Sequence, residues 1–528
     1  MTHEHPNHKW WTLFAMCFAL FMIMLDNTIV NVALPSIQRE LKPTPENLEW
    51  TVNAYILVFA TLILLGGKLG DRFGRRRIFM VGLLIFTLSS MACALAQTDT
   101  QLIAFRAVQG VGGALLNPLS LSILVAAFPR KQLPQAIGIW AGISGLGLAI
   151  GPLLGGFLTQ HFSWSAVFWV NVPIGVVAMG VTAWAVIESR DPAARSLDVV
   201  GTVLISAGLF ALTWGLIKTA NHAWLGTYTL SFLVASAVLI ALFVIWESRI
   251  SDPMIPLSFF RIRAFSVSSI VVALVGLALF GVIYFLTLYF QNVRGYDPIQ
   301  AGLRTLPTTM MILFVAPIGG RLSGRVGPRW LMTIGMFSAS IGLFGLSFVH
   351  MHSSYNAIWP FQMLMGAGMA LTMPAVSATG MAAVERTKAG IASGVINASR
   401  QVGGALGIAV LGGIGTTLAA NQWSDKIAGL SPSLHAQAEK LVPLVQGGQG
   451  KAILAITHNP TAETNALQAF VHGVDRALLT GAGLTFAAAL VALFGLAHMP
   501  TQSAEASHAP EGGDAGEAAE APPAIVEM

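Results

Sequence analysis

The stretch "SIVVALVGLALFGVIYFLTLYF" (residues 269–290) decides the fold class, because it contains no charged residue. A helix of about 20 apolar residues spans the roughly 30 Å hydrocarbon core of a bilayer and satisfies its own backbone hydrogen bonds there. A similar block, "FMVGLLIFTLSSMACALA", covers residues 79–96. Of the 528 residues, 55% are hydrophobic and only 10% are charged, whereas soluble proteins carry about 25% charged residues. We therefore expect an all-α polytopic membrane protein.

Apolar blocks of this length recur along the whole chain. They predict fourteen transmembrane helices, at 12–33, 48–67, 78–96, 102–126, 136–159, 165–187, 198–217, 227–247, 265–289, 301–320, 330–350, 357–380, 390–419 and 473–497. An even number of spans places both termini on one side. The loops on that side hold most of the Lys and Arg residues, as in "GKLGDRFGRRR" (67–77). The positive-inside rule then predicts a multi-pass protein of the plasma (inner) membrane with both termini in the cytoplasm.

An internal repeat divides the chain into two halves. "GKLGDRFGRR" (67–76) resembles "GRLSGRVGPR" (320–329), and each follows the second span of a six-span unit. This predicts six-helix bundles at 12–187 and 265–497, with two inserted linker spans at 198–247. Two like-oriented halves suit a transporter in which one half rocks against the other. Chance recurrence of short basic glycine turns is the alternative.

Three segments fall outside the predicted bilayer. Residues 1–11 form a cytoplasmic N-terminus, and residues 420–472 form a long external loop with short amphipathic helices. The tail 498–528 holds six acidic residues and no Lys or Arg, and is rich in Ala, Gly and Pro. A segment of that composition cannot bury a core, so we expect it to be disordered and cytoplasmic.

The first span carries an unexpected acid, Asp26, within "LDNTIVNVALPSI" (25–37). A charge at this depth is expensive, so its side chain should face a cavity or a partner. Arg106 in the fourth span falls in the same outer half of the membrane by the 1.5 Å rise per residue. The two side chains can therefore interact if their helices adjoin, and Asp26 can take up and release a proton. The alternatives are a structural carboxylate locked by hydrogen bonds, and an Arg106 that reaches outward to the interface or caps backbone carbonyls.

Several motifs, taken in order, resemble those of the major facilitator superfamily and of its fourteen-span drug:proton antiporter family (multidrug efflux permeases). They are "LDNTIVNVALP" (25–35), "GKLGDRFGRRR" (67–77), "LIAFRAVQGVGGAL" (102–115), "GLAIGPLLGGFL" (147–158), "FWVNVPIG" (168–175), "GYDPIQAGLRTLP" (295–307) and "ASRQVGGALG" (398–407). The resemblance covers nearly the whole chain. It implies the major facilitator fold, with two six-helix bundles plus two inserted spans, and a role for Asp26 and Arg106 in proton transfer. Gly324 departs from the pattern, since an acid is common there.

Two glycine-rich elements are predicted to shape the conformational change. The loop after the second span is expected to act as a conformational gate that latches the outward-facing state, through Gly67, Gly70, Asp71, Arg72, Gly74 and Arg75, with Arg325 in the second half. The resemblance assigns an antiporter motif to the fifth span, with Gly147, Gly151, Pro152, Gly155 and Gly156. A purely topological basic loop and ordinary helix packing are the alternatives for these two elements.

The predicted substrate cavity combines polar, aromatic and thioether side chains, which tolerate many ligands. Its candidates are Asn27, Asn31, Tyr55, Trp140, Asn171, Tyr284, Tyr289, Met310, Met311 and Arg400. Arg400 either hydrogen-bonds carbonyls of a neighbouring helix or meets an anionic ligand group. Fewer than half of the candidates are expected to reach substrate, because packing or lipid contact explains most of them.

These features predict a proton-coupled antiporter, a monomer, that exports amphipathic and chiefly cationic drugs or toxic compounds. Its partners are protons, the small-molecule substrate and the bilayer. The sequence leaves open whether a periplasmic adaptor and an outer-membrane channel also take part. An exporter of one defined metabolite or antibiotic fits equally well. The sequence has no ATP-binding P-loop, no metal or nucleophile constellation and no feature that calls for a cofactor or nucleic acid. A membrane enzyme or a transport-dead sensor is a remote alternative.

Overall fold

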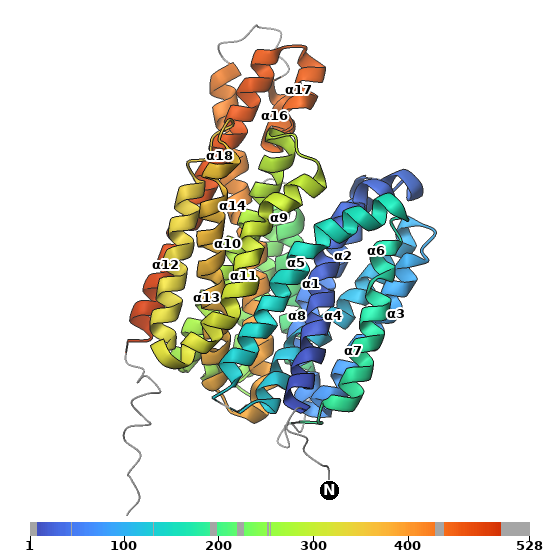
Figure 1. The fold of residues 1–528 in the computed structure, drawn as a ribbon, viewed down its shortest axis with the longest axis vertical. Coiled ribbons are helices and arrows are strands. Elements are labelled where there is room, and N and C mark those ends of the chain that lie inside the picture. Colours follow the sequence, from blue (N-terminus) through green and yellow to red (C-terminus); the bar gives the residue numbers. More distant parts are fainter. Residues whose placement is uncertain are drawn as a thin grey trace, which may run out of the picture.

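The computed structural model describes residues 8–43, 45–129, 131–190, 198–218, 226–250, 253, 255–427 and 438–497. Figure 1 shows long, roughly parallel helices. The helices, with the short 3₁₀ and π turns labelled η, are α1 (His8–Leu41), α2 (Pro45–Phe73), α3 (Arg75–Ala94), α4 (Asp99–Ala127), α5 (Leu133–His161), α6 (Ala166–Trp169), α7 (Asn171–Ala185), α8 (Val199–Lys218), α9 (Thr227–Glu247), η1 (Leu257–Arg261), α10 (Arg263–Leu288), η2 (Tyr289–Val293), α11 (Pro298–Val326), α12 (Pro328–Leu346), η3 (Tyr355–Ala357), α13 (Trp359–Ala382), η4 (Arg386–Lys388), α14 (Ala389–Ile427), α16 (Ala438–Gln446), α17 (Gly450–Thr457) and α18 (Pro460–Gly495).

Every predicted span coincides with helix in the structure. Among the described residues, twelve helices are long and apolar enough to cross a membrane. The two predicted spans outside this set correspond to α5 and to α8, whose apolar stretch is the shorter Val199–Gly215. The count of fourteen therefore remains a prediction. The span predicted at 165–187 is divided between α6 and α7 at Val170, because Pro173 has no N–H to donate to the preceding turn.

The long helices form two bundles, as the repeat predicted. The first contains α1 to α5 with α7, and the second contains α10 to α14 with α18 (Figure 1). Two pairs of helices join the bundles most extensively, α5 with α11 and α2 with α14, and α4 with α14 and α5 with α13 add smaller contacts. The two larger pairs correspond under the repeat, because α11 carries the second copy of the α2 motif. The inserted helices α8 and α9 pack on each other, and α8 also covers α2 and α14.

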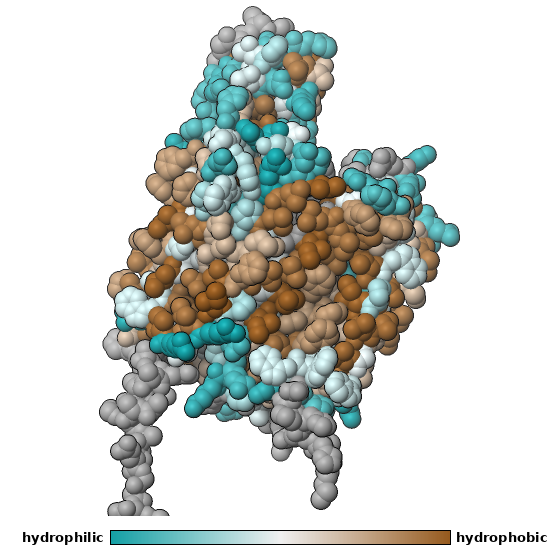
Figure 2. Space-filling model, viewed as in Figure 1, coloured by the Kyte–Doolittle hydropathy of each residue, from teal (hydrophilic) through white to brown (hydrophobic). Residues whose placement is uncertain are grey.

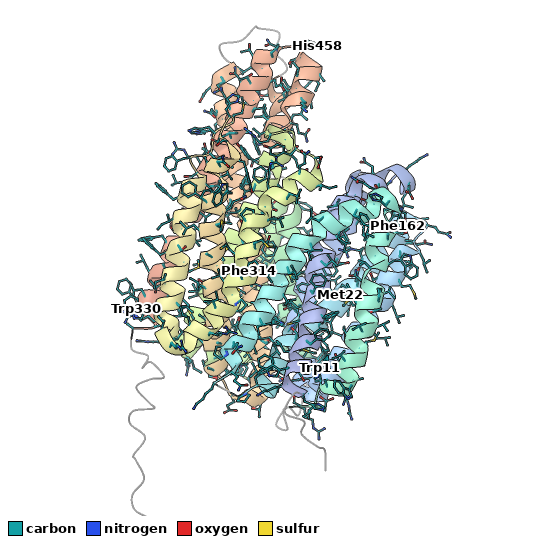
Figure 3. The ribbon with its side chains drawn as sticks, in the orientation of Figure 1. Trp11, Met22, Phe162, Phe314, Trp330 and His458 are labelled. Atoms are coloured by element: carbon teal, nitrogen blue, oxygen red, sulfur yellow. The ribbon has the colours of Figure 1, made fainter. Side chains whose placement is uncertain are left out.

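Hydropathy marks an apolar band across the face of the molecule that Figure 2 draws. The figure shows apolar residues across the middle and hydrophilic residues at both ends. Apolar side chains such as Val234, Phe314 and Phe344 are exposed, and a soluble protein would not present so large an apolar surface. Figure 3 places Trp11 and Trp330 towards the same end of the molecule, where aromatic rings commonly meet the lipid headgroups. The chain is thus a multi-pass helical membrane protein.

The segment predicted as an external loop at 420–472 is mostly helical where the structure describes it. The ends of α14 and α18 extend beyond the apolar band and meet α16 and α17 (Figure 1). They share a small core of Trp423, Ile427, Leu441, Val445, Ile453, Ala462, Ala466 and Ala469. Hydropathy locates where lipid contact ends, not where a helix ends, so it does not predict this cap. The acidic tail 498–528 and residues 1–7 lie outside the described residues.

Candidate functional site

The carboxylate of Asp26 lies at the centre of the first bundle, with no exposed surface. Arg106 Nη1 on α4 donates to Asp26 Oδ2 at 2.6 Å, and Arg106 is only 1% exposed. The depth argument from the sequence expected both side chains in the same half of the membrane, and the structure joins them directly. The ion pair is neutral as a whole, which limits the cost of burying its charges in a low dielectric.

Two amide side chains complete the environment of Asp26. Gln109 Nε2 on α4 and Asn171 Nδ2 on α7 donate to Asp26 Oδ1 at 3.0 and 3.1 Å. Asn171 Nδ2 also donates to Ser90 Oγ on α3 at 3.1 Å. Helices α1, α4 and α7 therefore meet at one carboxylate, and α3 joins the cluster through Ser90. Asp26, Arg106, Gln109 and Asn171 are at most 1% exposed, so the cluster is closed to solvent in this structure.

The guanidinium of Arg106 is fixed on its other sides as well. Its Nε donates to the carbonyl of Thr51 on α2 at 3.0 Å, and its Nη1 donates to Gln109 Oε1 at 2.9 Å. The ring of Tyr55, with its centroid 4.5 Å from Arg106 Cζ, covers the planar face. Tyr55 is 1% exposed, and its hydroxyl has no hydrogen-bond partner among the residues that the structure describes. A cation on an aromatic face is favourable, and more so when water is excluded.

Small residues in α4 let α2 approach Arg106. A Cβ added at Gly110 would lie 2.7 Å from the Tyr55 carbonyl oxygen, and one at Gly113 would lie 2.8 Å from the Tyr55 hydroxyl. Residues 106, 110 and 113 follow one helical face, so the motif "FRAVQGVGG" places a cation and two contact glycines on the same side. The glycines here serve helix packing around the ion pair.

The glycines of the predicted antiporter motif pack α5 against α1. Cβ atoms added at Gly147 and Gly155 would lie 2.9 Å from side-chain atoms of Met24 and Ile29, and one at Gly151 would overlap Thr28. The same helix includes Pro152. Gly156 faces Ile299 of α11 in the second bundle, with 2.7 Å between its added Cβ and the Ile299 side chain. The motif therefore fixes α5 between α1 and α11, next to the helix that carries Asp26.

The residues predicted as a loop after the second span hold the two bundles together at one end as a latch, but all of them except Gly74 are helical, because α2 continues to Phe73 and α3 begins at Arg75. Asp71 Oδ1 and Oδ2 accept hydrogen bonds from the backbone N–H groups of Gly390 and Ile391 at 3.0 and 2.9 Å. Arg75 Nη2 donates to Asp71 Oδ1 and to the carbonyl of Thr387, both at 2.8 Å. An acid that accepts from the first turn of α14 also meets the positive end of the helix dipole. The contact joins the first bundle to the second through buried charges.

Other residues of the predicted gate support this geometry. Gly67 abuts the carbonyl of Gly390, Gly70 abuts the side chain of Leu119, and Gly74 adopts a φ of 108° that L residues avoid. Arg72 lies over the Phe73 ring, 5.1 Å from its centroid. In the second half, Arg325 is exposed and takes no part in the latch.

The predicted cavity residues divide into buried and accessible groups. Tyr55 and Asn171 belong to the Asp26 cluster, Trp140 donates from Nε1 to Ser120 Oγ at 3.2 Å, and the Tyr289 hydroxyl donates to the His350 carbonyl at 2.8 Å. These four side chains are at most 2% exposed. The accessible side chains are Asn27, Asn31, Tyr284, Met310, Met311 and Arg400. Whether they contact substrate stays a prediction.

Arg400 lies in α14 of the second bundle and differs from Arg106 in its surroundings. Its Nη2 donates to Asn397 Oδ1 at 3.3 Å, and its buried Nε has no hydrogen-bond partner in the part of the chain that the structure describes. None of the carboxylates that the structure describes forms an ion pair with it. Among the described residues, the expected bond to a carbonyl of a neighbouring helix is not formed.

Sequence reasoning missed Gln109, Ser90 and Asn397. Gln109 stands one turn after Arg106, and that spacing on a helix with a buried cation is the signal that would have identified it. Ser90 had no such signal, since its contact with Asn171 depends on how α3 and α7 pack. Within the described part of the chain, no three His, Cys, Asp or Glu side chains gather as a metal site.

A family model described as "Major Facilitator Superfamily" matches residues 16–408. The chain is 34% identical over 511 residues to the tetracenomycin C resistance and export protein of Streptomyces glaucescens, covering 93% of this chain and 95% of that protein. It is 36% identical over 458 residues to the multidrug resistance protein Stp of Mycobacterium tuberculosis, covering 86% of this chain and 83% of that one.

Solved structures share the fold at low identity. The human organic anion transporter MFSD10 (TETRAN) aligns with a TM-score of 0.61 at 13% identity, over 92% of this chain and 99% of that one. The proton:xylose symporter XylE aligns with a TM-score of 0.56 at 13% identity, over 94% and 96%. At this identity the likeness concerns the fold alone.

Proposed function

The chain belongs to the major facilitator superfamily and is a membrane transporter, not an enzyme; on that premise, we propose that it is a proton-coupled antiporter that exports amphipathic drugs or toxic compounds. The observation that carries the proposal is the Asp26–Arg106 pair, buried at the junction of four helices. A carboxylate in this position is the group of the described first bundle best placed to exchange a proton as the helices move.

The geometry suggests how a proton would act on the bundle. Protonation of Asp26 removes the charge that holds Arg106 Nη1, and it weakens two amide hydrogen bonds to Oδ1. Because those partners come from α4 and α7, the packing of these helices against α1 depends on the proton. The cluster has no access to water in this conformation, so we expect exchange to occur in another state of the cycle.

The latch supplies the second element of alternating access. Its contacts close the junction at the end that carries the basic loops, which we place in the cytoplasm of a plasma membrane, with both termini on that side. The structure would then represent a state closed towards the cytoplasm. We treat the transporter as a monomer, and the hydrophilic cap of α16 and α17 as the surface that an adaptor would meet. His458→Cys, at the tip of the cap (Figure 3), should react with an impermeant thiol reagent on intact cells, whereas the native Cys17 and Cys93 are buried and should not.

A narrower function remains as a second candidate. The relative from Streptomyces glaucescens is described as a resistance and export protein for one compound, whereas the relative from Mycobacterium tuberculosis is described as a multidrug resistance protein. Transport of several unrelated amphiphiles by the purified protein would favour the broad function. Transport restricted to one scaffold would favour an exporter of a defined metabolite or antibiotic.

The central test uses inverted vesicles with an imposed proton gradient and a panel of cationic, neutral and anionic fluorescent amphiphiles. We expect the wild type to accumulate at least one of them and to release protons in exchange, and Asp26→Asn to do neither. Asp425→Asn, at an exposed acid in the cap, makes the same chemical change and should behave as the wild type.

Two results would reject the proposal. Accumulation that persists when an ionophore collapses the gradient excludes proton coupling. Equal exchange by a folded Asp26→Asn protein, verified by size-exclusion chromatography and thermal unfolding, removes Asp26 from the mechanism. Asp26→Glu keeps the charge and should retain partial activity, which separates loss of the acid from loss of the fold.

A further inference from the structure

Arg400 is a cation without an anionic partner among the described residues, in the middle of the membrane. It is the twelfth residue of α14 (Ala389–Ile427), about 16 Å from the start of the helix at 1.5 Å per residue. That depth is roughly half of the hydrocarbon thickness. Among the described residues, its buried Nε has no hydrogen-bond partner and its Nη2 makes the one long bond to Asn397. A partly buried guanidinium without a counterion is costly, which points to a ligand that provides one.

The position of Arg400 on α14 directs it towards the junction between the bundles. Ser393, Asn397 and Arg400 follow one helical face, and Ser393 Oγ donates across the junction to the Pro118 carbonyl of α4 at 2.7 Å. Residues 389–398 of α14 are all buried, whereas residues 399–402 are partly exposed. The bundles therefore separate at the level of Arg400, just beyond their last buried turn of contact.

The side of α2 that faces α14 shows the same transition. Gly67 lies against Gly390, and Gly394 lies opposite Ile63 and Leu64. Beyond that level, Ile56 on α2 is partly exposed, as Arg400 is on α14. An amphipathic compound entering between the bundles would thus meet an apolar wall on α2 and one positive charge on α14.

We propose that Arg400 binds the anionic group of the transported amphiphile, a carboxylate, sulfonate or phenolate, with Asn397 orienting the guanidinium. This proposal rests on the proposed export function and names its substrate class. Asp26 offers no site for a cation in this conformation, because Arg106 already neutralises it. The unpaired Arg400 instead favours an anion, and a guanidinium can bind its oxygens with two parallel hydrogen bonds. The expectation of chiefly cationic substrates, made from the sequence, stays a prediction, and the binding test below decides between the two.

Asn397 connects this site to the junction. Its Oδ1 accepts from Arg400 Nη2, and its Nδ2 donates to the Ser393 carbonyl at 3.0 Å. Ser393 in turn makes the bond to Pro118 in the first bundle. Hydrogen bonds through Asn397 and Ser393 therefore link a ligand on Arg400 to the Ser393–Pro118 contact. That contact must break when the bundles separate at the latched end.

The test compares two probes that share one scaffold. 1-Anilino-8-naphthalenesulfonate carries a sulfonate, and N-phenyl-1-naphthylamine is its uncharged parent. Equilibrium binding to the protein in nanodiscs, with empty nanodiscs subtracted, should show the anion bound about tenfold to a hundredfold tighter. Arg400→Gln should remove this preference by weakening the binding of the anionic probe alone, and Arg400→Lys should keep part of the preference.

Controls separate the site from general charge effects. Arg261→Gln removes one positive charge from an exposed position and should leave the preference unchanged. The proposal is overturned if the wild type does not prefer the anion, or if a folded Arg400→Gln protein keeps the preference. Binding is measured without a gradient, so its failure is distinct from failure of proton-driven export, which is read from flux and from Asp26→Asn.

Discussion

Gly67 in α2 and Gly320 in α11 stand at corresponding places in the repeat, and each packs against a helix of the opposite bundle. Gly67 abuts the carbonyl of Gly390 at the start of α14, and Gly320 abuts the carbonyl of Pro134 at the start of α5. The turns that follow also correspond, since Gly74 and Gly327 have φ angles of 108° and 87°. The close approach of backbone to backbone is thus repeated in both halves.

The charges at these two places differ. Asp71, four residues after Gly67, accepts from two N–H groups of α14. The residue four positions after Gly320 is Gly324, which is exposed and would meet nothing within 4 Å of an added Cβ. Pro134, the counterpart of Gly390, has no N–H to donate. The two halves therefore share their packing, and only the first half latches through an acid.

The interior shows the same asymmetry. The first bundle buries Asp26 with Arg106, and the second leaves Arg400 without a counterion among the residues described. A paired acid suits a proton, and an unpaired cation suits an anionic ligand. We infer that the repeat has divided the two tasks of coupling and substrate binding between its halves.

The largest expected effect separates the two arginines. Arg106→Gln leaves Asp26 buried without its counterion, which should lower stability by about 3–5 kcal/mol. Arg400→Gln removes a charge that has no ionic partner in the described structure, so it should not destabilise the protein. Thermal and denaturant unfolding in matched detergent would measure both. Equal losses for the two variants would contradict the distinction between a paired and an unpaired charge.

The double variant Asp26→Asn with Arg106→Gln sharpens this result. Removing both charges leaves no orphaned ion, so part of the stability lost in Arg106→Gln should return. Proton-coupled transport should not return, because the acid is absent. Recovery of transport without recovery of stability would show that the pair is not the coupling element.

The sequence predicted the architecture because lipid imposes a simple rule on every span. Blocks of about 20 apolar residues must be helices, and each predicted block is helical in the structure. The rule reports on lipid contact, so it missed the continuation of α14 and α18 into the polar cap, and it did not place the break at Val170.

Within the site, the depth of each residue along its helix predicted that Asp26 and Arg106 can interact. The partners Gln109 and Asn171 depend on helix rotation and on how α4 and α7 pack against α1, which hydropathy does not specify. Aromatic residues such as Tyr55 and Tyr289 were expected in the cavity wall but pack inside the bundles. Composition alone does not distinguish the face of a helix that meets its neighbour from the face that meets ligand.

The second prediction concerns Gly390, where the backbone of α14 lies against the carboxylate of Asp71. A Cβ at Gly390 would overlap the carboxylate of Asp71, so Gly390→Ala should weaken the latched state by about 1–3 kcal/mol. Gly412→Ala, in the same helix with nothing within 4 Å of its Cβ, is the matched control. Spin labels at Lys131 and Glu385, which are exposed on opposite bundles at the latched end, should move apart only in Gly390→Ala. An unchanged distance distribution would show that the latch does not set the conformation.

The third prediction removes the charge of the latch and keeps its shape. Asp71→Asn keeps one acceptor oxygen for α14 but loses the ionic bond to Arg75, whose Nη2 also holds the Thr387 carbonyl. Charge-assisted hydrogen bonds are worth about 1.5–3 kcal/mol, so a shift of about that size towards the unlatched state is expected. The same spin-label pair reports it. No shift would mean that the glycine packing alone closes the junction.

The smallest effect is expected at Gly324, the counterpart of Asp71 in the second half, where Asp can again be compared with Asn. Gly324→Asp and Gly324→Asn differ only in charge, which cancels the common effect of replacing a helical glycine. Because Pro134 offers no N–H and position 324 is exposed, the two variants should differ by less than about 0.5 kcal/mol in the latch equilibrium. A difference as large as that between the wild type and Asp71→Asn would show that an acid can latch either half. The asymmetry would then be a matter of one residue, and Gly324→Asp should slow transport by stabilising the closed junction.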